Sequence, residues 1–282
     1  MIISVKKAFD TDFNGRFREI IMDPLNILIN RVSSSGTINN NNVVLHNGIE
    51  VPYQGKYAYY GNFSNILVYN RGVHEPLEEF IFQELLKKMP ETPFMIELGA
   101  YWGHYSMWLK KYKPLSTVIL IEPNKHNLLV GKSNFNRLNL DGNFIQKKVG
   151  HQNFSVDDFI KQKKLKKLNI LHSDIQGYEL EMLEDSKKSL SLCVIDYLMI
   201  STHSQSLHYE IINYLKLFNY DIEVSSDFDN ETTSFDGFIL ASSPKVEKII
   251  NNWKPLGRLE ILNSSPLDIY NYIMNTKKDF NI

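Results

Sequence analysis

The stretch Met95–Ser106, which reads MIELGAYWGHYS, decides the fold of this chain. Its apolar beginning predicts a buried strand, the glycines at positions 99 and 103 predict a turn, and the residues from His104 onward predict a helix. A strand that turns on glycines into a helix is the opening unit of nucleotide-binding α/β folds. The rest of the chain is therefore expected to add strands and helices to this unit.

Between about residue 73 and residue 242 the sequence alternates between helical and strand patterns. Short apolar runs predict strands over residues 94–98, 118–121, 143–149, 168–171 and 194–201. Two neighbouring strands, 221–225 and 235–242, close the series and predict an antiparallel edge. This rhythm predicts an α/β fold with a Rossmann-like, mostly parallel seven-stranded sheet, helices on both of its faces and an antiparallel edge strand.

Residues 1–70 predict a small β-rich N-terminal extension or cap. Asn47-Gly48 lies between two apolar runs, which is a strong hairpin signal, and residues 57–60 and 66–69 continue the strand-like pattern. Residues 71–243 form the predicted α/β domain, and residues 244–282 a helical tail packed on it. The tail would either cover the sheet or form a dimer interface, so a homo-oligomer is left open.

Composition excludes several classes of protein. The net charge of −1 differs from the basic footprint of a nucleic-acid binder, and the lysines of residues 161–167 predict the solvated face and end of a helix. A single cysteine, Cys193, allows no intrachain disulfide, as expected in a reducing compartment. No stretch approaches the roughly 20 apolar residues of a membrane span. We expect a cytoplasmic protein without a nucleic-acid partner.

Polar side chains gather where the predicted strands end. Parallel strands place their carboxyl ends at one edge of the sheet, where α/β folds bind ligands. The acidic and imidazole side chains at these ends are Glu97, Glu122, His151, His172, Asp174 and His203. Their clustering along one edge predicts a binding or catalytic site.

The first two strand ends indicate the kind of ligand. A dinucleotide site favours Gly-x-Gly-x-x-Gly, but Tyr101 occupies the middle glycine position. Glu97 would repel a phosphate and suits the positively charged amine and sulfonium of S-adenosylmethionine. Glu122, 23 residues after Gly99, can accept hydrogen bonds from ribose hydroxyls. The alternative interpretation is an ordinary βα turn and a surface glutamate.

Five stretches together resemble the FkbM-type family of S-adenosylmethionine-dependent methyltransferases. They are GVHEP at 72–76, ELGAYWG at 97–103, Glu122-Pro123, Asp157-Asp158, and HSDIQGYE at 172–179. The last is the most diagnostic, and the resemblance spans roughly residues 70 to 242. The chain departs from the family pattern at Tyr101, where Asn is usual, and at His172 and Gln176, which replace Lys and Glu.

The resemblance implies S-adenosylmethionine as cofactor and methyl transfer to a hydroxyl of a sugar, a glycan or a secondary metabolite. It places Glu75 near the methionine amino group. The predicted cofactor-binding residues are Glu75, Glu97, Gly99, Ala100, Tyr101, Gly103, Glu122 and Asp174.

Methyl transfer to oxygen needs a base for the hydroxyl proton, and histidine is suited to this near neutral pH. We predict His203 as the base, with Asp174 orienting the acceptor and His172 beside it. A divalent metal bound by Asp174, His203 and His172 is the alternative, because a metal can also acidify a hydroxyl. The third interpretation is that His203 only packs or caps the next helix.

Two other functions compete with this prediction. A nicotinamide-dependent oxidoreductase would need the Gly-x-Gly-x-x-Gly pattern, which is missing after residue 98. A non-catalytic nucleoside-binding or interaction protein on a methyltransferase fold would tolerate the loss of His203 or Asp174.

Overall fold

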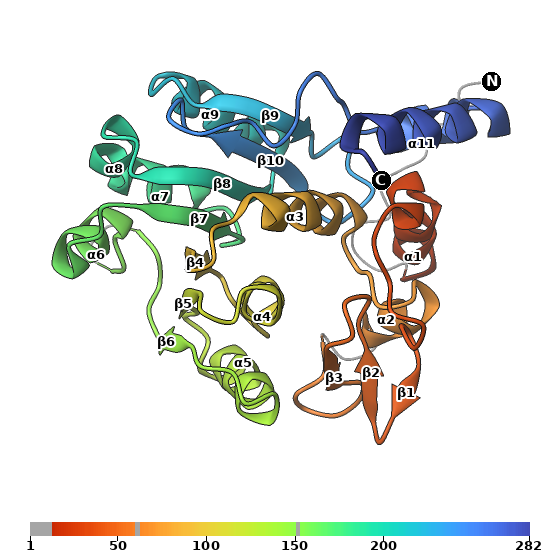
Figure 1. Cartoon of the computed structure of the whole chain (residues 1–282), viewed down its shortest axis with the longest axis horizontal. Coiled ribbons are helices and arrows are strands. Elements are labelled where there is room, and N and C mark those ends of the chain that lie inside the picture. The colour runs from red at the N-terminus through yellow and green to blue at the C-terminus, as the bar shows by residue number, and fades with distance from the viewer. Residues whose placement is uncertain (1–12, 60–62, 151–152) are drawn as a thin grey trace. The chain divides into compact units, whose positions relative to one another are not determined.

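The structure is a computed structural model that describes residues 13–59, 63–150 and 153–282 (Figure 1). Internal contacts divide the chain into two compact units. The first consists of Met1–Glu84, Ser226–Gly237 and Trp253–Ile282, and the second of Leu85–Ser225 and Phe238–Asn252. The predicted division at residues 70 and 243 stays a prediction.

A seven-stranded sheet with the order β6-β5-β4-β7-β8-β10-β9 organises the second unit. The strands are β4 (Phe94–Leu98), β5 (Thr117–Ile121), β6 (Asn143–Ile145), β7 (Leu168–Ser173), β8 (Ile195–Thr202), β9 (Asp221–Ser226) and β10 (Gly237–Ser242). The run from β6 to β8 is parallel, and β10 and β9 form an antiparallel edge pair. The predicted fold class is thereby confirmed.

Helices follow the strands along the chain. They are α3 (Pro76–Lys88), whose residues are shared between the two units, α4 (His104–Tyr112), α5 (Lys125–Arg137), α6 (Val156–Lys163), α7 (Glu179–Asp185), α8 (Lys187–Ser191) and α9 (Gln205–Lys216). Ile119 and Ile121 of β5 belong to the core cluster that contains residues of α6, α7, α8 and α9. The alternate residue Leu120 lies beside Phe135 of α5, so helices cover both faces. Every residue of β7 and β8 is buried, as expected for central parallel strands.

The first unit contains a small three-stranded antiparallel sheet. Its elements are α1 (Phe13–Met22), the 3-10 helix η1 (Pro24–Ile27), β1 (Ile38–Asn39), β2 (Asn42–Val44), β3 (Glu50–Pro52), α2 (Ser64–Tyr69), α10 (Arg258–Asn263) and α11 (Pro266–Phe280). Val43 pairs with Val51, which confirms the predicted hairpin around Asn47-Gly48. Phe80 of α3 packs its ring 4.9 Å from that of Phe280, so both ends of the chain's sequence contribute to this unit.

Two strand predictions in the first unit are wrong. Residues 57–59 form a turn, and residue 60 lies outside the described residues. Residues 66–69 belong to helix α2, where Ile66 and Leu67 are fully buried. A short apolar run does not distinguish a strand from a buried helical turn, and here the carbonyls of Ile66 and Leu67 accept local hydrogen bonds from Asn70 and Gly72.

Two predicted elements of the second unit are shorter than expected. The strand predicted over 143–149 ends at Ile145, because its partner β5 ends at Ile121, the residue opposite. The helix predicted to reach residue 167 ends at Lys163, because Lys164 adopts a left-handed conformation with φ of 52°.

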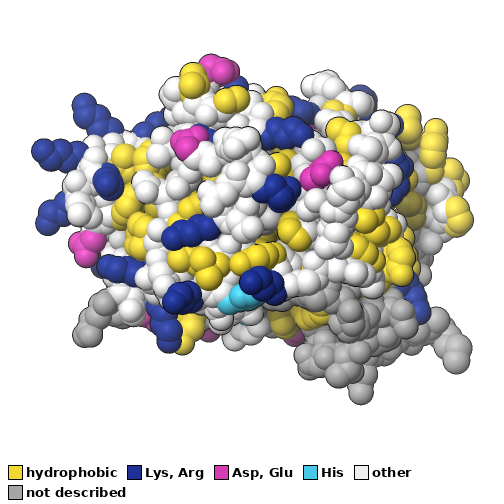
Figure 2. Space-filling view, turned by 90° about the horizontal axis from the view of Figure 1, so that it is seen from below, with side chains coloured by type: hydrophobic (Ala, Val, Ile, Leu, Met, Phe, Trp, Pro, Cys, Tyr) yellow, Lys and Arg dark blue, Asp and Glu magenta, His cyan; other side chains and the backbone are white. Residues whose placement is uncertain are grey.

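The basic segment at the end of α6 and directly after it is solvated, as predicted. Lys161, Lys163, Lys164, Lys166 and Lys167 are all exposed. In Figure 2, which views the molecule of Figure 1 from below, basic side chains project on the left. This is the side on which α6 lies in Figure 1. Within residues 13–59, 63–150 and 153–282, no helix has the length and apolar character needed to cross a bilayer.

Candidate functional site

The turn between β4 and α4 leaves no space for a side chain at its first glycine. Gly99 has φ of +74°, and a Cβ built there would lie 1.7 Å from the carbonyl oxygen of Asp174. The N–H groups of Gly99 and Ala100 both donate to the carbonyl of Ile121, at 2.9 and 3.0 Å. The turn is therefore held between the ends of β5 and β7, and only glycine fits at position 99. Gly103, at φ of +75°, begins α4 as its N-cap.

Tyr101 adopts a left-handed conformation, with φ of 39°. Such a conformation is unusual for an aromatic residue, whereas the Asn expected from the family pattern tolerates it. The N–H of Tyr101 donates to Oε2 of Glu122 at 3.2 Å. Glu122 therefore stabilises the strained turn from the neighbouring strand.

Glu122 connects this turn to the start of α5. Its Oε1 accepts a hydrogen bond from the N–H of Asn124, the N-cap of α5, at 2.8 Å. Burial raises the pKa of Glu122, although hydrogen bonds from Asn124 and Tyr101 oppose the shift. Each carboxylate oxygen has a further lone pair, so hydroxyl donors of a ligand can still bind.

Glu97 is turned toward helix α4. The side chain is buried, and Oε2 accepts a hydrogen bond from the N–H of Ser106 at 3.1 Å. This contact satisfies one of the free amides at the helix N-terminus, where the N-cap Gly103 has no side chain to do so. Burial raises the pKa of Glu97, against the charge of His172 and the hydrogen bonds from Ser106. Glu97 thus anchors α4, and its contact with a cofactor amine stays a prediction.

The ends of β7 and β8 bring four polar side chains together. Nε2 of His203 lies 3.1 Å from Oδ1 of Asp174 and 2.9 Å from Nε2 of Gln176. Gln176 also donates to Oδ1 of Asp174 at 2.9 Å. On the other side of the ring, Nδ1 of His203 lies 3.0 Å from Oε1 of Glu179. The predicted pair of Asp174 and His203 is therefore adjacent.

Sequence reasoning did not assign a role to Glu179. This residue begins α7, is fully buried, and accepts hydrogen bonds from the N–H groups of Ile175 and Gly177 at 3.0 and 3.1 Å. Glu179 is the last residue of the family-like stretch 172–179, so the sequence did point to it. No local pattern, however, shows that its carboxylate lies beside His203, which follows β8.

Electrostatics keep Asp174 ionised. Burial alone would raise the pKa of this carboxyl group, but the hydrogen bond from His203 and the charges of His203 and His172 lower it overall. Asp174 is one-third exposed, at 34% of its side-chain surface. It therefore presents a carboxylate at the strand ends, and with His203 it offers an oxygen and a nitrogen donor to a metal.

His172 lies inside the sheet. It pairs in register with Glu97 and is 4% exposed, with its ring 4.4 Å from that of Tyr105. β7 continues through Ser173, one residue past His172. The predicted catalytic role of His172 stays a prediction, and His151 lies outside the described residues.

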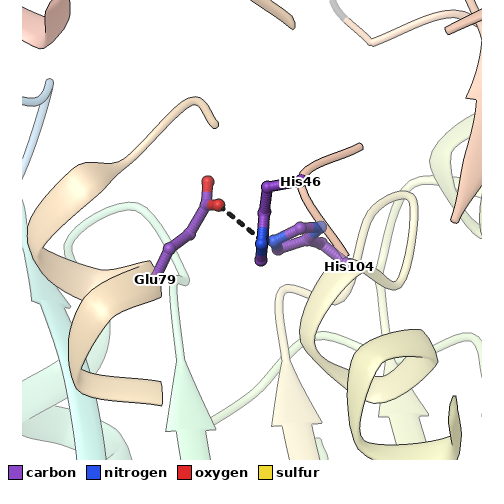
Figure 3. A group of neighbouring side chains, drawn as sticks. All are labelled: His46, Glu79 and His104. Atoms are coloured by element: carbon purple, nitrogen blue, oxygen red, sulfur yellow. Dashed lines mark ion pairs between the residues drawn. The ribbon is translucent and has the colours of Figure 1, made fainter. Parts of the chain in front are cut away.

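Glu75 belongs to the first unit, in a buried chain of imidazoles and carboxylates. Oε2 of Glu75 lies 3.2 Å from Nε2 of His74, and Nδ1 of His74 lies 2.6 Å from Oε1 of Glu79. The other oxygen of Glu79 points to the ring of His46, with 2.9 Å between Oε2 and Nε2 (Figure 3). The N–H groups of His74 and Glu75 also donate to Glu79. This chain ties the start of α3 to the residues after β2, and the predicted contact of Glu75 with a cofactor stays a prediction.

Part of the chain is similar to a known protein family. Residues 142–222, less than half of the chain, match the family model described as the methyltransferase FkbM domain. No curated protein sequence matches the chain.

Three similar solved structures have low identity to this chain. The TrmK structure of M. capricolum in complex with S-adenosyl-homocysteine has a TM-score of 0.41 and 15% identity. The aligned region covers 70% of this chain and 82% of the TrmK chain. Precorrin-6y C5,15-methyltransferase of Geobacter metallireducens has a TM-score of 0.44 and 10% identity, and the aligned region covers 59% of this chain and 87% of that protein's chain. The METTL16 methyltransferase domain has a TM-score of 0.46 and 13% identity, and the aligned region covers 60% of this chain and 66% of the METTL16 chain. At such values the similarity carries no argument about function.

The sheet order, the glycine turn after β4 and the acidic end of β5 define a Rossmann-like α/β fold, a class in which ligands bind at the carboxyl ends of the strands. The match of residues 142–222 to the methyltransferase FkbM domain model agrees with the family resemblance found in the sequence.

Proposed function

We propose that this protein is an S-adenosylmethionine-dependent methyltransferase that transfers the methyl group of its cofactor to a hydroxyl oxygen of a small molecule, a sugar, glycan or secondary metabolite. The observation that carries the proposal is the environment of His203, with a buried carboxylate at Nδ1 and the ionised Asp174 beside Nε2. An imidazole between two carboxylates at the strand ends is suited to taking a proton from a hydroxyl.

The first two strand ends fit S-adenosylmethionine. The turn from Gly99 to Gly103 follows β4, where α/β folds bind ligands, and its backbone is fixed by the contacts of Gly99 with Asp174 and Ile121. We assign to Glu122 the role of accepting hydrogen bonds from the ribose hydroxyls. Ala100, Tyr101 and Gly103 complete the proposed cofactor contacts, and Glu97 supports them by fixing the start of α4.

When bound, the cofactor supplies a methyl group that is already activated on a sulfonium. The protein then has two tasks, which are to align the acceptor oxygen with that methyl group and to remove its proton. We assign the alignment to Asp174, whose carboxylate can accept a hydrogen bond from a second acceptor hydroxyl. We assign the proton to His203. The single cysteine supports a cytoplasmic location for this activity.

Calorimetry and methyl-transfer assays test the proposal. Titration should detect binding of S-adenosylmethionine and none of NAD. A panel of sugars and sugar nucleotides should then contain methylated products whose new group is on oxygen. Failure to bind S-adenosylmethionine would contradict the cofactor assignment, and methylation on nitrogen would contradict the acceptor class.

The variant His203→Ala separates catalysis from binding. It should lower turnover by about 100-fold or more, because general-base catalysis contributes on that order, and leave cofactor affinity within about threefold. Unchanged turnover would show that His203 is not the base. It would then favour a non-catalytic binding protein or another base.

A divalent metal is the second candidate for activating the hydroxyl. The distance of 3.1 Å between Oδ1 of Asp174 and Nε2 of His203 favours it, since one ion can bind both atoms. Activity that is lost with EDTA and restored by Mg²⁺ or Mn²⁺ would support the metal and make His203 a ligand. Activity that persists in EDTA would support His203 as base.

A further inference from the structure

We propose that the first unit binds a phosphate ester, with the phosphate held by the guanidinium groups of Arg31 and Arg71 and its attached sugar or base ring against Tyr69. The site is a cavity of about 460 Å³ between helix η1, the segment that follows η1 and the end of α2. It lies within one unit, and its ligand need not be methylated. The inference therefore goes beyond the proposed methyl transfer and does not depend on it.

The lining of this cavity is positively charged. Its charged and amide side chains are those of Arg31, Arg71, Asn26 and Asn70, and none of the described residues that line it is acidic. The volume is in the range of small-molecule sites, and a concave surface of one charge attracts ligands of the opposite charge. An anionic small molecule is the ligand that fits this lining.

Arg31 is held in place and keeps an available donor. Its Nη1 donates to the carbonyls of Asn26 and Ile29, and its Nη2 donates to Oδ1 of Asn26 at 3.2 Å. The same Oδ1 accepts a hydrogen bond from Nδ2 of Asn70 at 2.9 Å, which connects the two walls of the cavity. Each Nη carries two N–H groups, so one N–H of Nη2 has no acceptor among the described residues.

Arg71 is an exposed arginine with a fixed backbone. It has φ of 51°, its N–H donates to the carbonyl of Val68 at 3.2 Å, and a Cβ on Gly36 would lie 2.8 Å from its Cα. Left-handed positions after a helix favour Gly or Asn, so an arginine here costs stability. In the described part of the chain, no hydrogen bond or ion pair of its side chain offsets that cost. Its N–H donors are therefore available to a ligand.

The two guanidinium groups interact with each other. Burial lowers the pKa of Arg31, the charge of Glu79 opposes this shift, and the charge of Arg71 lowers the pKa further. An anion bound by both groups removes their repulsion. A carboxylate has two oxygens and is matched by one guanidinium, whereas the phosphate of an ester has three acceptor oxygens and a larger charge. Two arginines at one cavity therefore favour phosphate.

An apolar wall lies beside the arginines. Tyr69 and Ile27 both line the cavity and are 63% and 65% exposed, although their side chains are large and apolar. The ring of Phe17 packs edge-on against Tyr69, with 5.9 Å between the centroids, and so supports its orientation. Aromatic side chains stack on bases and sugar rings. The ring attached to the phosphate is assigned to this wall.

Calorimetry of the full-length protein at about 0.15 M salt tests the site. The probes are pyrophosphate, UDP and glucose 1-phosphate, and the controls are uridine and malonate. The phosphate probes should bind with Kd values of about 1 mM or lower, and the controls about tenfold more weakly or less. Tighter binding of UDP than of glucose 1-phosphate would assign a base to Tyr69, and the reverse order would assign a sugar.

Three variants locate the binding. Arg71→Gln should weaken the binding of every phosphate probe about tenfold or more, the loss expected for a charge-assisted hydrogen bond. Lys278→Gln removes the same charge from an exposed position of α11 in the same unit and should change affinity by less than about twofold. Tyr69→Ala should weaken the tighter ring-bearing probe about fivefold or more and leave pyrophosphate, which has no ring, within about twofold.

Several results would overturn the inference. They are the absence of binding by any phosphate probe, equal losses in Arg71→Gln and Lys278→Gln, and binding of uridine or malonate as tight as that of the phosphates. If Arg71→Gln does not fold by circular dichroism, phenylglyoxal modification of the wild-type protein decides. Saturating pyrophosphate should protect Arg71, as read by peptide mass spectrometry, and unchanged modification would contradict the site. None of these measurements uses S-adenosylmethionine, so a failure of the proposed function remains distinguishable.

Discussion

Gly99 shows how one residue constrains the site. Its positive φ alone would make any side chain unfavourable. In addition, a Cβ at this position would lie only 1.7 Å from the carbonyl oxygen of Asp174, which excludes a side chain altogether. A substitution must therefore separate the turn after β4 from the end of β7. The backbone geometry and the place of Asp174 depend on the same glycine.

Gly99→Ala should destabilise the protein by about 3 kcal/mol or more, because the new methyl group meets backbone rather than a flexible side chain. Gly55→Ala is the matched control. Gly55 has φ of +92° but nothing within 4 Å of the added Cβ, so only the left-handed strain of about 1 kcal/mol applies. Urea unfolding of both variants measures the difference. Equal losses would contradict the close contact.

His74 makes stability depend on pH. Burial alone would lower its pKa, but the charges of Glu75 and Glu79 outweigh burial and raise it to about 10 from 6.5. The folded-state pKa lies above the unfolded value, so the stabilisation is complete below about pH 6.5 and is lost as the pH rises toward 10. His46 faces the other oxygen of Glu79 and shares this carboxylate.

The free energy of unfolding should therefore fall between pH 7 and pH 10, with a contribution from His74 of up to about 1.4 kcal/mol per pH unit. His74→Gln should remove that slope and lower stability at pH 6. Denaturant unfolding across the pH range measures both effects. Parallel curves for wild type and variant would show that His74 is not held charged.

At the scale of elements, the Asp157-Asp158 pair has a structural explanation. Asp157 lies in α6, yet its two oxygens accept hydrogen bonds from the N–H groups of Lys188 and Ser189 at 2.8 Å each. The carboxylate thereby caps helix α8, whose N-cap Ser186 makes no side-chain cap hydrogen bond. Two helices separated by strand β7 are joined through one side chain.

Asp157→Ala should cost about 1–2 kcal/mol of stability, the usual loss for a helix cap. Asp158→Ala removes the same charge from the exposed neighbour and should cost about 0.5 kcal/mol or less. Thermal unfolding compares the two variants. If both lose the same stability, charge rather than capping accounts for the effect.

Elements with local signals were predictable, and those that depend on partners were not. The glycines around Trp102 and the Asn47-Gly48 turn act through their own backbone, so the sequence shows them. The end of β6 at Ile145 depends on where β5 stops, and the helical state of residues 66–69 depends on burial in the first unit. The contact of Glu179 with His203 likewise joins two strand ends that no local pattern connects.

At the scale of the whole molecule, both units are discontinuous in sequence. The first unit receives Trp253 and Phe280 from the last segment, whose rings lie 5.8 and 4.9 Å from that of Phe80. In the second unit, β10 occupies the place between β8 and β9 although β9 precedes it along the chain. Periodicity predicted the strands, but their spatial order comes from long-range pairing.

This strand order has a consequence for synthesis on the ribosome. β9 emerges before β10, so it has no neighbour to pair with until residue 242 is free, and Phe80 lacks the ring of Phe280 until residue 280 is free. Nascent chains stalled with residues 1–230 exposed should be cleaved within residues 221–226, whereas chains exposing residues 1–250 should be protected there. Equal protection would contradict the insertion of β10 as the closing step. The last strand to enter the sheet thus fills a position between two other strands and not an edge, so that the sheet cannot grow in the order in which it is translated.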